Sequence, residues 1–316
     1  MLARLLGRLG QSVLVLLVVS MVSFLVFRYI GDPTVSLLGE DASVAEREAL
    51  LHELGFGQSV PVQYAGYLKQ VLGGQFGISY RFRQPVTEVI ASRVPATVER
   101  SLAAALFAVV GGIGLGVYTA MRRPSLVSRT IMGVSLPTFL IGIGLIYLFS
   151  VELKWLPAFG RGTLVNVGGW QTGLLTVSGL SALVLPAITL GFFKLTLIMR
   201  LVRTEMLDVL RIDYIRFARA RGLRNATLYG RHALRNTLIP VITIIGLQLG
   251  SLIAFAIVTE TVFQWPGLGL LFITSIQGVD VPVISAYLLM IGLLYIGINL
   301  VVDLLYAWAD PRLRRR

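Results

Sequence analysis

The sequence contains no cysteine. Disulfide bonds, thiolate metal sites and thiol nucleophiles are therefore excluded for this chain, and cysteine usage cannot report its redox compartment. Histidine is almost as scarce, because only His52 and His232 occur and they lie in different loops. Imidazole and thiolate are the ligands that build most transition-metal sites. We therefore expect no metal site built by this chain alone.

Lysine is also scarce. The chain has three lysines, which directly follow Leu68, Leu153 and Phe193. A phosphate-binding P-loop requires a Gly-Lys pair, so the chain has no Walker motif for ATP. The acidic residues are scattered and do not gather at one end of the apolar segments, which disfavours a membrane enzyme. We expect no catalytic residues in this chain and no cofactor bound by it.

Charged residues make up only 14% of the chain, whereas 55% of its residues are hydrophobic and the mean hydropathy is +0.79. This composition is typical of a membrane protein. We therefore predict an all-α polytopic membrane protein with six transmembrane helices. Apolar stretches close to the roughly 20 residues that span a bilayer occur at 11–30, 101–121, 131–151, 180–201, 237–258 and 283–302.

The distribution of arginine and lysine predicts how these helices are oriented. If the N-terminus is cytoplasmic, the segments on the cytoplasmic side carry 18 of the 28 basic residues, and the loops on the other side carry 7. Nine of the 18 lie between Arg200 and Arg235. Because basic loops resist translocation, we expect both termini to be cytoplasmic.

The segment YIRFARARGLRNATLYGRHALRNTLIP, residues 214–240, holds six arginines and no acidic residue. A basic loop of this kind can be no more than a topology signal. This one is patterned, however, because four of its residues fall on one helical face at i, i+3, i+4 and i+7, namely Tyr214, Phe217, Ala218 and Arg221.

Gly222 follows this helix at the place where a left-handed C-terminal residue is expected. Asn225 fits the N-cap of a second short helix, which runs through Leu228 to Leu234. Two helices joined by a glycine turn make a rigid knob that suits a pocket on another protein. Nucleic acid is disfavoured as the partner, because no aromatic residues are interleaved for base stacking and no known binding module is present.

The sequence DYIRFARARGL, followed by RHALRNTLIPVI, resembles the cytoplasmic coupling loop of binding-protein-dependent ABC importer permeases, in the dipeptide, oligopeptide and nickel branch. The resemblance covers nearly the whole chain. Further motifs in the family's order are GDP at 31–33, QPVTEVIASRVPATVERS at 84–101, SLPTFLIG at 135–142, WLPAFG at 155–160, LVLPAITLG at 183–191, ETVFQWPGLG at 260–269, DVP at 280–282 and DPRLR at 310–314.

The resemblance implies a type I ABC importer permease fold in the bacterial cytoplasmic (inner) membrane. It implies pairing with a paralogous permease, two cytoplasmic ATPase subunits that carry ATP and Mg, and an extracytoplasmic solute-binding protein. In the family, closure of the ATPase dimer is passed on through the coupling helix. That role would fall here on Tyr214, Arg216, Phe217, Ala218, Arg219, Arg221 and Gly222.

This chain departs from the general permease motif, which starts Glu-Ala-Ala, because it has Arg216, Phe217 and Ala218 at those positions. The arginine and the long spacing from Gly222 to Pro240 resemble the peptide branch. A dipeptide or oligopeptide is then the expected solute, while glutathione, nickel complexes, opines and oligosaccharides stay open. A homodimer of permeases stays open as well.

The fifth apolar stretch lines the path in the family, which makes Gln248 and Ser251 candidates for lining it. Gly246 and Gly250 are candidates too, although close helix packing is an equal explanation for them. The same small-residue spacing occurs in the second stretch at glycines 111, 112, 114 and 116.

An ion-coupled secondary transporter that needs no ATPase is the alternative function. Such a carrier would place ionisable groups near the middle of the membrane. Arg28 and Arg200 stand at the ends of their stretches, so the residues to consider are Lys194 and Asp303, the latter just after the last stretch, and both lie nearer the cytoplasmic end. Snorkelling or mutual pairing explains these two residues as well as a proton relay does.

The outer loop contains the pattern of a helical capping box at Ser43 and Glu46, with Gly55 ending that helix. We expect four parts along the chain: a cytoplasmic tail with the first helix (1–30), an extracytoplasmic loop with short helices (31–95), a transmembrane core (96–310) that includes the coupling loop 204–236, and a basic tail (311–316).

Overall fold

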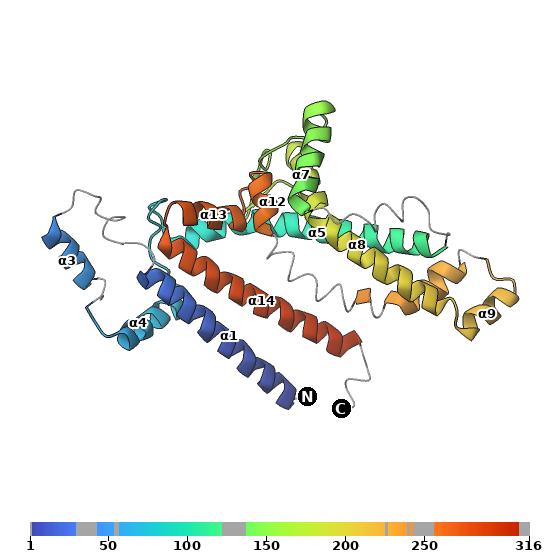
Figure 1. The fold of residues 1–316 in the computed structure, drawn as a ribbon, viewed down its shortest axis with the longest axis horizontal. Coiled ribbons are helices and arrows are strands. Elements are labelled where there is room, and N and C mark those ends of the chain that lie inside the picture. Colours follow the sequence, from blue (N-terminus) through green and yellow to red (C-terminus); the bar gives the residue numbers. More distant parts are fainter. Residues whose placement is uncertain are drawn as a thin grey trace. The chain divides into compact units, whose positions relative to one another are not determined.

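The computed structural model is mostly helical and describes residues 2–29, 43–53, 57–121, 137–224, 227–238, 241–242 and 256–309 (Figure 1). Four helices are long: α1 (Leu2–Tyr29), α5 (Val86–Met121), α8 (Val177–Val209) and α14 (Val281–Ala309). The shorter elements are α3 (Val44–Glu53), α4 (Val60–Leu72), α7 (Thr138–Ile146), the π-helix η1 (Tyr147–Glu152), β1 (Val165–Val167), β2 (Trp170–Thr172), α9 (Asp213–Ala220), the π-helix η2 (Leu228–Ala233), α12 (Ala256–Val262) and α13 (Leu268–Gln277).

Within the described residues, three helices are long and apolar enough to cross a membrane, at Gly10–Tyr29, Val86–Met121 and Val177–Val209. Helices α7 and α14 coincide with two more of the predicted stretches. The fifth stretch lies mostly outside the described residues, and α12 forms its last part. Helix α5 begins 15 residues before its predicted stretch, because hydropathy locates the apolar part of a helix and not its hydrogen-bonded ends.

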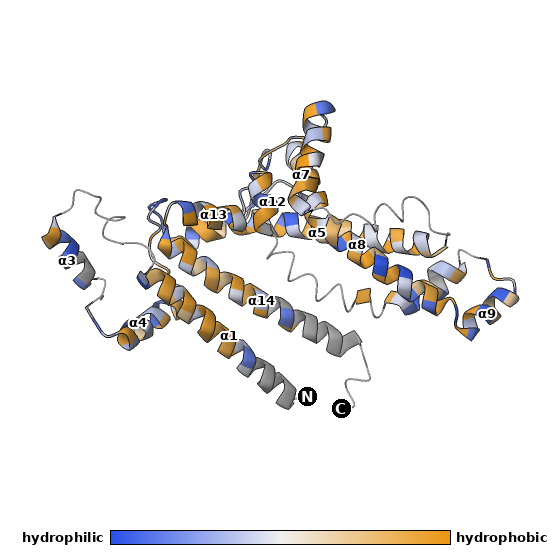
Figure 2. Cartoon of the chain, viewed as in Figure 1, coloured by the Kyte–Doolittle hydropathy of each residue, from blue (hydrophilic) through white to orange (hydrophobic). Residues whose placement is uncertain are grey.

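The chain forms two compact units. Unit 1 comprises Met1–Val94 and Gly267–Gly297, and unit 2 comprises Pro95–Pro266 and Ile298–Arg316. Figure 2 shows that α1 is hydrophobic along most of its described length, whereas hydrophilic residues recur along α9. In the most apolar stretch of α8, 72% of the residues are buried, against 17% in α1. Helix α8 is therefore the central helix of unit 2.

In unit 1, helices α1 and α14 lie side by side (Figure 1). A reciprocal pair of hydrogen bonds between serines joins them. The Ser23 hydroxyl donates to the carbonyl oxygen of Ser285 at 2.7 Å, and the Ser285 hydroxyl donates to the carbonyl oxygen of Ser23 at 3.1 Å. Because the Ser23 proton is used in this way, the Tyr67 hydroxyl of α4 must donate to Ser23 Oγ, at 2.9 Å. Helix α4 is thereby fixed against α1.

The loop before α5 is fixed to the start of α14 through Asp280, which is completely buried. Its carboxylate accepts hydrogen bonds from the Ser79 hydroxyl and from the backbone N–H groups of Tyr80 and Arg81 at 3.1 and 3.3 Å. Burial, with a smaller contribution from the Asp280 charge, raises the pKa of Tyr80 to about 12. This loop is therefore held by a polar anchor and not by apolar packing alone.

The predicted capping box at the start of α3 is confirmed. The Ser43 hydroxyl and backbone N–H both donate to Glu46 Oε2, at 2.7 and 2.9 Å. The Glu46 N–H in turn donates to Ser43 Oγ at 3.3 Å. These hydrogen bonds lower the pKa of Glu46, because they stabilise its charged form. The predicted end of this helix, Gly55, lies outside the described residues.

Helices α5 and α8 approach closely in unit 2, as the glycine spacing predicted. A Cβ atom on Gly112 would lie 2.8 Å from the Cβ atom of Ile198, and one on Gly116 would lie 2.6 Å from the Cβ atom of Val202. Gly114 differs, because no neighbouring atom lies within 4 Å of the Cβ position. Gly112 and Gly116 thus face α8 directly, one helical turn apart.

Candidate functional site

The predicted coupling helix forms as α9 and is fixed to the end of α8. Its anchor is Ile215, which is completely buried. Ile215 belongs to one apolar cluster with Met206 and Val209 of α8 and Leu228 of η2. Helix α9 is therefore a rigid extension of the span α8 and not a free loop.

The glycine turn after α9 is also confirmed. Gly222 has a φ of +79°, in the left-handed region. Its N–H donates to the carbonyl oxygen of Arg219 at 3.0 Å, and the N–H of Leu223 donates to that of Ala218 at 3.4 Å. This pair of hydrogen bonds is the Schellman motif, which closes a helix and reverses the chain. No atom lies within 4 Å of a Cβ position on Gly222, so the backbone alone requires glycine here.

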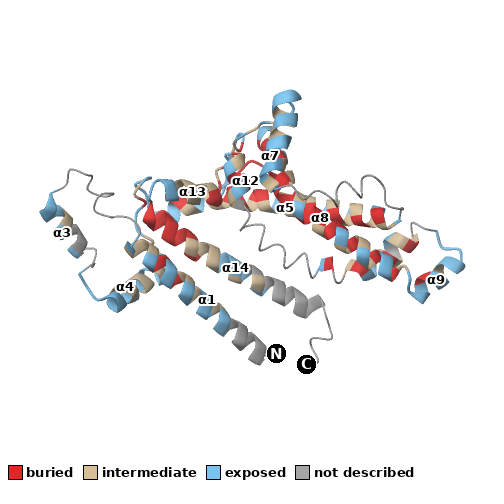
Figure 3. Ribbon diagram, viewed as in Figure 1, coloured by how far each residue is buried: buried red, intermediate tan, exposed pale blue. Residues whose placement is uncertain are grey.

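Most of α9 is exposed (Figure 3). Phe217 is 64% exposed, and the Arg221 guanidinium lies 5.6 Å from the centroid of its ring. Arg216 and Arg219 are exposed as well. An exposed aromatic ring with neighbouring arginines has the composition of a protein-interface hot spot.

The four residues predicted to share one face of α9 divide between two environments. Ala218 packs against the apolar cluster beside Ile215, whereas Phe217 is exposed. The Tyr214 hydroxyl donates to the carbonyl oxygen of His232 at 3.4 Å and accepts from the Asn236 side chain. The four residues keep their helical spacing, with Arg221 over the Phe217 ring, and the buried Ile215 beside them sets which side of α9 packs.

The second predicted helix of the loop is present but begins as a π-helix. Residues Leu228–Ala233 form η2, and helical structure continues to residue 238. Leu228 and Ala233 are both completely buried in the same apolar cluster as Ile215. The predicted N-cap, Asn225, and Pro240 lie outside the described residues. π-Helical turns are frequent at functional sites, and hydropathy patterns do not reveal them.

The residues predicted to line the path lie outside the described residues, namely Gly246, Gln248, Gly250 and Ser251. Lys194 is buried in α8, with its ammonium group 5.6 Å from the centroid of the Phe193 ring. The side chain of Asp303 is not among those described, so the choice between snorkelling and pairing stays open. The described residues contain no group of three or more His, Cys, Asp or Glu side chains that could hold a metal ion.

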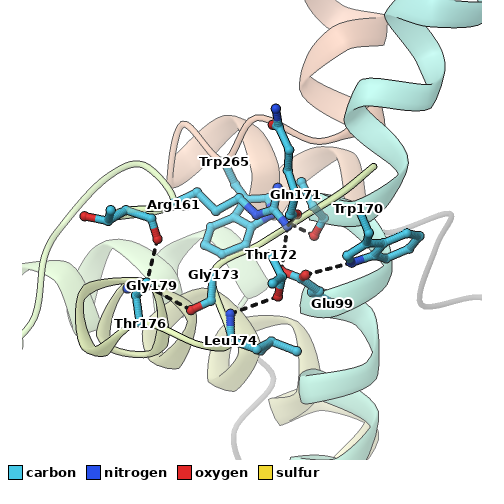
Figure 4. Close-up of polar contacts among 12 residues, drawn as sticks. Glu99, Arg161, Trp170, Gln171, Thr172, Gly173, Leu174, Thr176, Gly179 and Trp265 are labelled. Carbon is cyan, nitrogen blue, oxygen red and sulfur yellow. Dashed lines mark hydrogen bonds and ion pairs between the residues drawn. The ribbon is translucent and has the colours of Figure 1, made fainter. Parts of the chain in front are cut away.

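A buried polar cluster in unit 2, which sequence reasoning missed, joins α5 to the loop between η1 and α8 (Figure 4). Glu99 of α5 accepts a hydrogen bond from Arg161 Nη2 at 2.6 Å and from Trp170 Nε1 at 3.0 Å. Arg161 Nη2 also donates to the carbonyl oxygen of Gln171 at 2.7 Å. The side chains of this ion pair are only 4% and 5% exposed, so both charges are nearly removed from solvent.

The next residue of α5, Arg100, serves a different element. Its guanidinium lies 2.8 Å from Glu260 Oε1 of α12, and both side chains are fully buried. Glu260 Oε1 also accepts from the Thr97 hydroxyl at 2.8 Å. Trp265, just after α12, donates through Nε1 to the carbonyl oxygen of Ala96 at 2.9 Å. One turn of α5 thus holds both the end of α12 and the loop between η1 and α8.

That loop, residues 153–176, is a compact structure built around glycines. Its strands β1 and β2 pair antiparallel, with Val167 opposite Trp170 across Gly168 and Gly169, which both have positive φ. This small hairpin was not part of the all-α prediction, because strands of three residues are too short for a period-2 pattern to be read.

Close backbone contact fixes this loop to the start of α8. A Cβ atom on Gly179 would lie 2.2 Å from the carbonyl oxygen of Gly173. Thr176 caps α8 by accepting from the N–H of Gly179 at 3.0 Å, and its hydroxyl donates to the carbonyl oxygen of Thr163 at 2.7 Å. The loop is therefore tied to α5, α8 and the end of α12, all within unit 2.

The sequence did carry a signal for this cluster. Glu99 and Arg100 stand at the edge of an apolar stretch, and Glu260 with Trp265 belongs to the motif ETVFQWPGLG. Charged residues in such positions are costly unless they are paired. Their partners could not be read from the sequence, because 62 residues of chain separate Glu99 from Arg161.

The chain is similar to known proteins over nearly its whole length. Residues 1–103 match the N-terminal family of binding-protein-dependent transport system membrane components. The chain is 40% identical over 98% of its length to the di/tripeptide transport system permease protein DppB of Pseudomonas aeruginosa (strain UCBPP-PA14), of which 98% is covered. It is 38% identical over its full length to all of the dipeptide transport system permease protein DppB of Escherichia coli (strain K12).

A solved structure supports the fold. The methionine ABC transporter MetNI in its inward-facing conformation contains a chain that matches with a TM-score of 0.53 and 18% identity, covering 71% of this chain and 97% of that one. The central and C-terminal parts of the sequence, residues 112–315, match the family described as the binding-protein-dependent transport system inner membrane component. The chain belongs to this family of ABC importer permeases.

Proposed function

We propose that this chain forms half of the translocation path for a dipeptide or other small peptide in an ATP-driven importer. The observation that carries the proposal is the identity of 36 to 40% over nearly the whole chain to permeases named for dipeptide or di/tripeptide transport. Such an importer needs no nucleotide site in the permease, because ATP and Mg would be bound by separate cytoplasmic ATPase subunits.

The surface of α9 supports a protein partner on the cytoplasmic side. The Phe217 ring is 64% exposed and stands beside exposed arginines, which is the residue composition of an interface hot spot. Arg221 lies over the Phe217 ring, and Ile215 anchors the helix on α8. A displacement of α9 would therefore be transmitted directly to α8, since the two helices share one apolar cluster. The coupling residues in this proposal are Tyr214, Arg216, Phe217, Ala218, Arg219, Arg221 and Gly222.

The full assembly in this proposal has two permeases, two ATPases and a solute-binding protein. The second permease would be a paralogue that forms a heterodimer with this chain in the bacterial inner membrane. The proposal includes six spans, which follow from the six apolar stretches. It places both termini in the cytoplasm, which follows from the distribution of basic residues. The proposed parts are residues 1–30, 31–95, 96–310 with the coupling loop 204–236, and 311–316. Gly246, Gln248, Gly250 and Ser251 would line the path.

The decisive test compares two identical substitutions at exposed phenylalanines. Phe217→Asp alters α9. Phe159→Asp alters the loop of residues 153–176, called the hairpin loop below, in which the Phe159 ring is 60% exposed. Tagged permease would be purified from the native host, and the proteins that co-purify would be identified by mass spectrometry. Removing an interface hot spot costs about 2 kcal/mol or more, which is roughly a 30-fold loss of affinity.

We expect the wild type and Phe159→Asp to retain ATPase subunits and a second permease, while Phe217→Asp loses the ATPase. The purified complex in proteoliposomes should take up a labelled dipeptide only when ATP and the solute-binding protein are supplied. Uptake by the chain alone under a proton or sodium gradient would instead support the ion-coupled carrier and contradict the proposal.

A further inference from the structure

Two ion pairs on consecutive residues of α5 hold different elements of unit 2. The Arg100 pair joins α5 to α12 through Glu260, and both side chains are 0% exposed. The Glu99 pair joins α5 to the loop 153–176 through Arg161. The two pairs differ in the other contacts that hold the hairpin loop and α12 in place.

Arg161 contacts three elements at once (Figure 4). Its Nη2 atom lies 2.6 Å from Glu99 Oε2 of α5 and 2.7 Å from the carbonyl oxygen of Gln171 in β2. Its guanidinium also lies 6.0 Å from the centroid of the Trp265 ring, which follows α12. The neighbouring Gly160 N–H donates to the carbonyl oxygen of Phe263 at 3.1 Å. Arg161 thus lies where the hairpin loop, α5 and the segment after α12 meet.

Arg161 is not the only contact that holds these elements. The hairpin retains its bond from Trp170 Nε1 to Glu99, and the loop retains its contacts with the start of α8 through Thr176. Helix α12 retains Glu260 and its two partners on α5. A buried ion pair adds little net stability over an apolar replacement, and the best-attested use of such pairs is to select one arrangement.

We propose that Arg161 is a positioning residue of the transport cycle, which with Glu99 makes the hairpin loop and the end of α12 move as one body. Helix α12 continues the fifth apolar stretch, so this body carries the end of a span that the proposed function places along the path. The inference rests on that proposed function. The Arg100–Glu260 pair, in contrast, holds the fold.

The first measurement tests the positioning itself and does not depend on transport. Because the chain has no cysteine, spin labels can be placed at two exposed positions, Val167→Cys in β1 and Thr261→Cys in α12. Pulsed electron paramagnetic resonance then gives the distance distribution in the assembled complex. We expect one narrow distribution in the parent and a distribution at least twofold wider with Arg161→Met added. Equal widths would overturn the inference.

The second measurement asks whether this positioning matters for coupling. Arg161→Met, Glu99→Gln and the double variant would be compared in the reconstituted complex, with Lys154→Met and Glu88→Gln as exposed controls. We expect Arg161→Met to lower dipeptide taken up per ATP hydrolysed about tenfold, with ATPase retention and basal hydrolysis unchanged. The double variant should lose no more than the worse single variant, because the two residues act through one contact.

The outcomes separate the two proposals. If the wild-type complex takes up no dipeptide with ATP, the proposed function fails, while the distance measurement still decides the inference. If the wild type is coupled and Arg161→Met is equally coupled, the positioning role is wrong. It is also wrong if Arg161→Met loses its ATPase subunits, since Arg161 would then only hold the fold.

Discussion

The hydroxyl of Ser23 on α1 donates to the carbonyl oxygen of Ser285 on α14, and the hydroxyl of Ser285 donates to the carbonyl oxygen of Ser23. Each hydroxyl therefore bonds to the backbone of the opposite helix. Interhelical hydrogen bonds in membranes contribute about 0.6 kcal/mol on average and at most about 2 kcal/mol. Both serines are buried, so water does not replace a bond that is lost.

We expect Ser23→Ala and Ser285→Ala each to lower the free energy of unfolding in detergent by about 0.5 to 1.5 kcal/mol. Ser59→Ala is the control, because Ser59 is exposed and its side chain makes no capping bond. Unfolding would be followed by circular dichroism during titration with a denaturing detergent. If all three variants unfold together, the serine pair contributes nothing to the packing of α1 on α14.

The close approach of α5 and α8 predicts a strong difference between two glycines of the same helix. Gly116→Val would place a Cβ atom 2.6 Å from the Cβ atom of Val202, whereas the Cβ atom of Gly114→Val would have no neighbouring atom within 4 Å. Overpacking of this kind costs about 1 to 3 kcal/mol. We expect Gly116→Val to reduce the yield of folded permease on size-exclusion chromatography and Gly114→Val to leave it unchanged. Equal yields would contradict the packing described here.

The turn after α9 predicts that backbone conformation and not side-chain size decides what is tolerated at Gly222. Its φ of +79° disfavours β-branched residues strongly and asparagine much less. We expect Gly222→Val to lower peptide-stimulated ATP hydrolysis of the reconstituted complex several-fold and Gly222→Asn to retain most of it. Membrane insertion should be normal in both variants. Full coupling in an assembled Gly222→Val complex would remove the turn from the mechanism.

The pKa of Tyr80 predicts a loss of stability at alkaline pH. Its pKa is about 12 in the folded chain because of burial and the charge of Asp280, against 10.0 as the ordinary value. A raised pKa means that the folded state holds the proton more tightly, so this contribution is fully present below pH 10.0 and is lost as pH rises toward about 12. The substitution Tyr80→Phe removes it.

Absorbance at 295 nm reports ionised tyrosine, so the difference between the wild type and Tyr80→Phe isolates this group. We expect its titration midpoint near pH 12, and a lower midpoint in Asp280→Asn, which removes the negative charge. A midpoint near 10 in the wild type would show that Tyr80 is solvated and that the anchor at Asp280 is open.

The amino-acid sequence by itself determined the class of the protein, the helices and the local turns. Hydropathy located α1, α8 and α14, because the apolar stretch that a membrane requires is a property of contiguous residues. The capping box at Ser43 and the left-handed Gly222 were readable for the same reason, since each depends on residues within a few positions. The motifs of the coupling loop indicated the family as well, because each motif is a short run of contiguous residues.

Tertiary structure decided which residues that are far apart in the sequence contact each other. Whether Ile215 or Phe217 faced inward on α9 depended on the end of α8 and on Leu228, so the helical pattern alone did not say which side of α9 is buried. The partners of Glu99 and Arg100 lie 62 and 160 residues away, and no local pattern fixes such pairs. Buried charges reveal that partners must exist, because unpaired burial is too costly, but only the packed helices decide which residues meet.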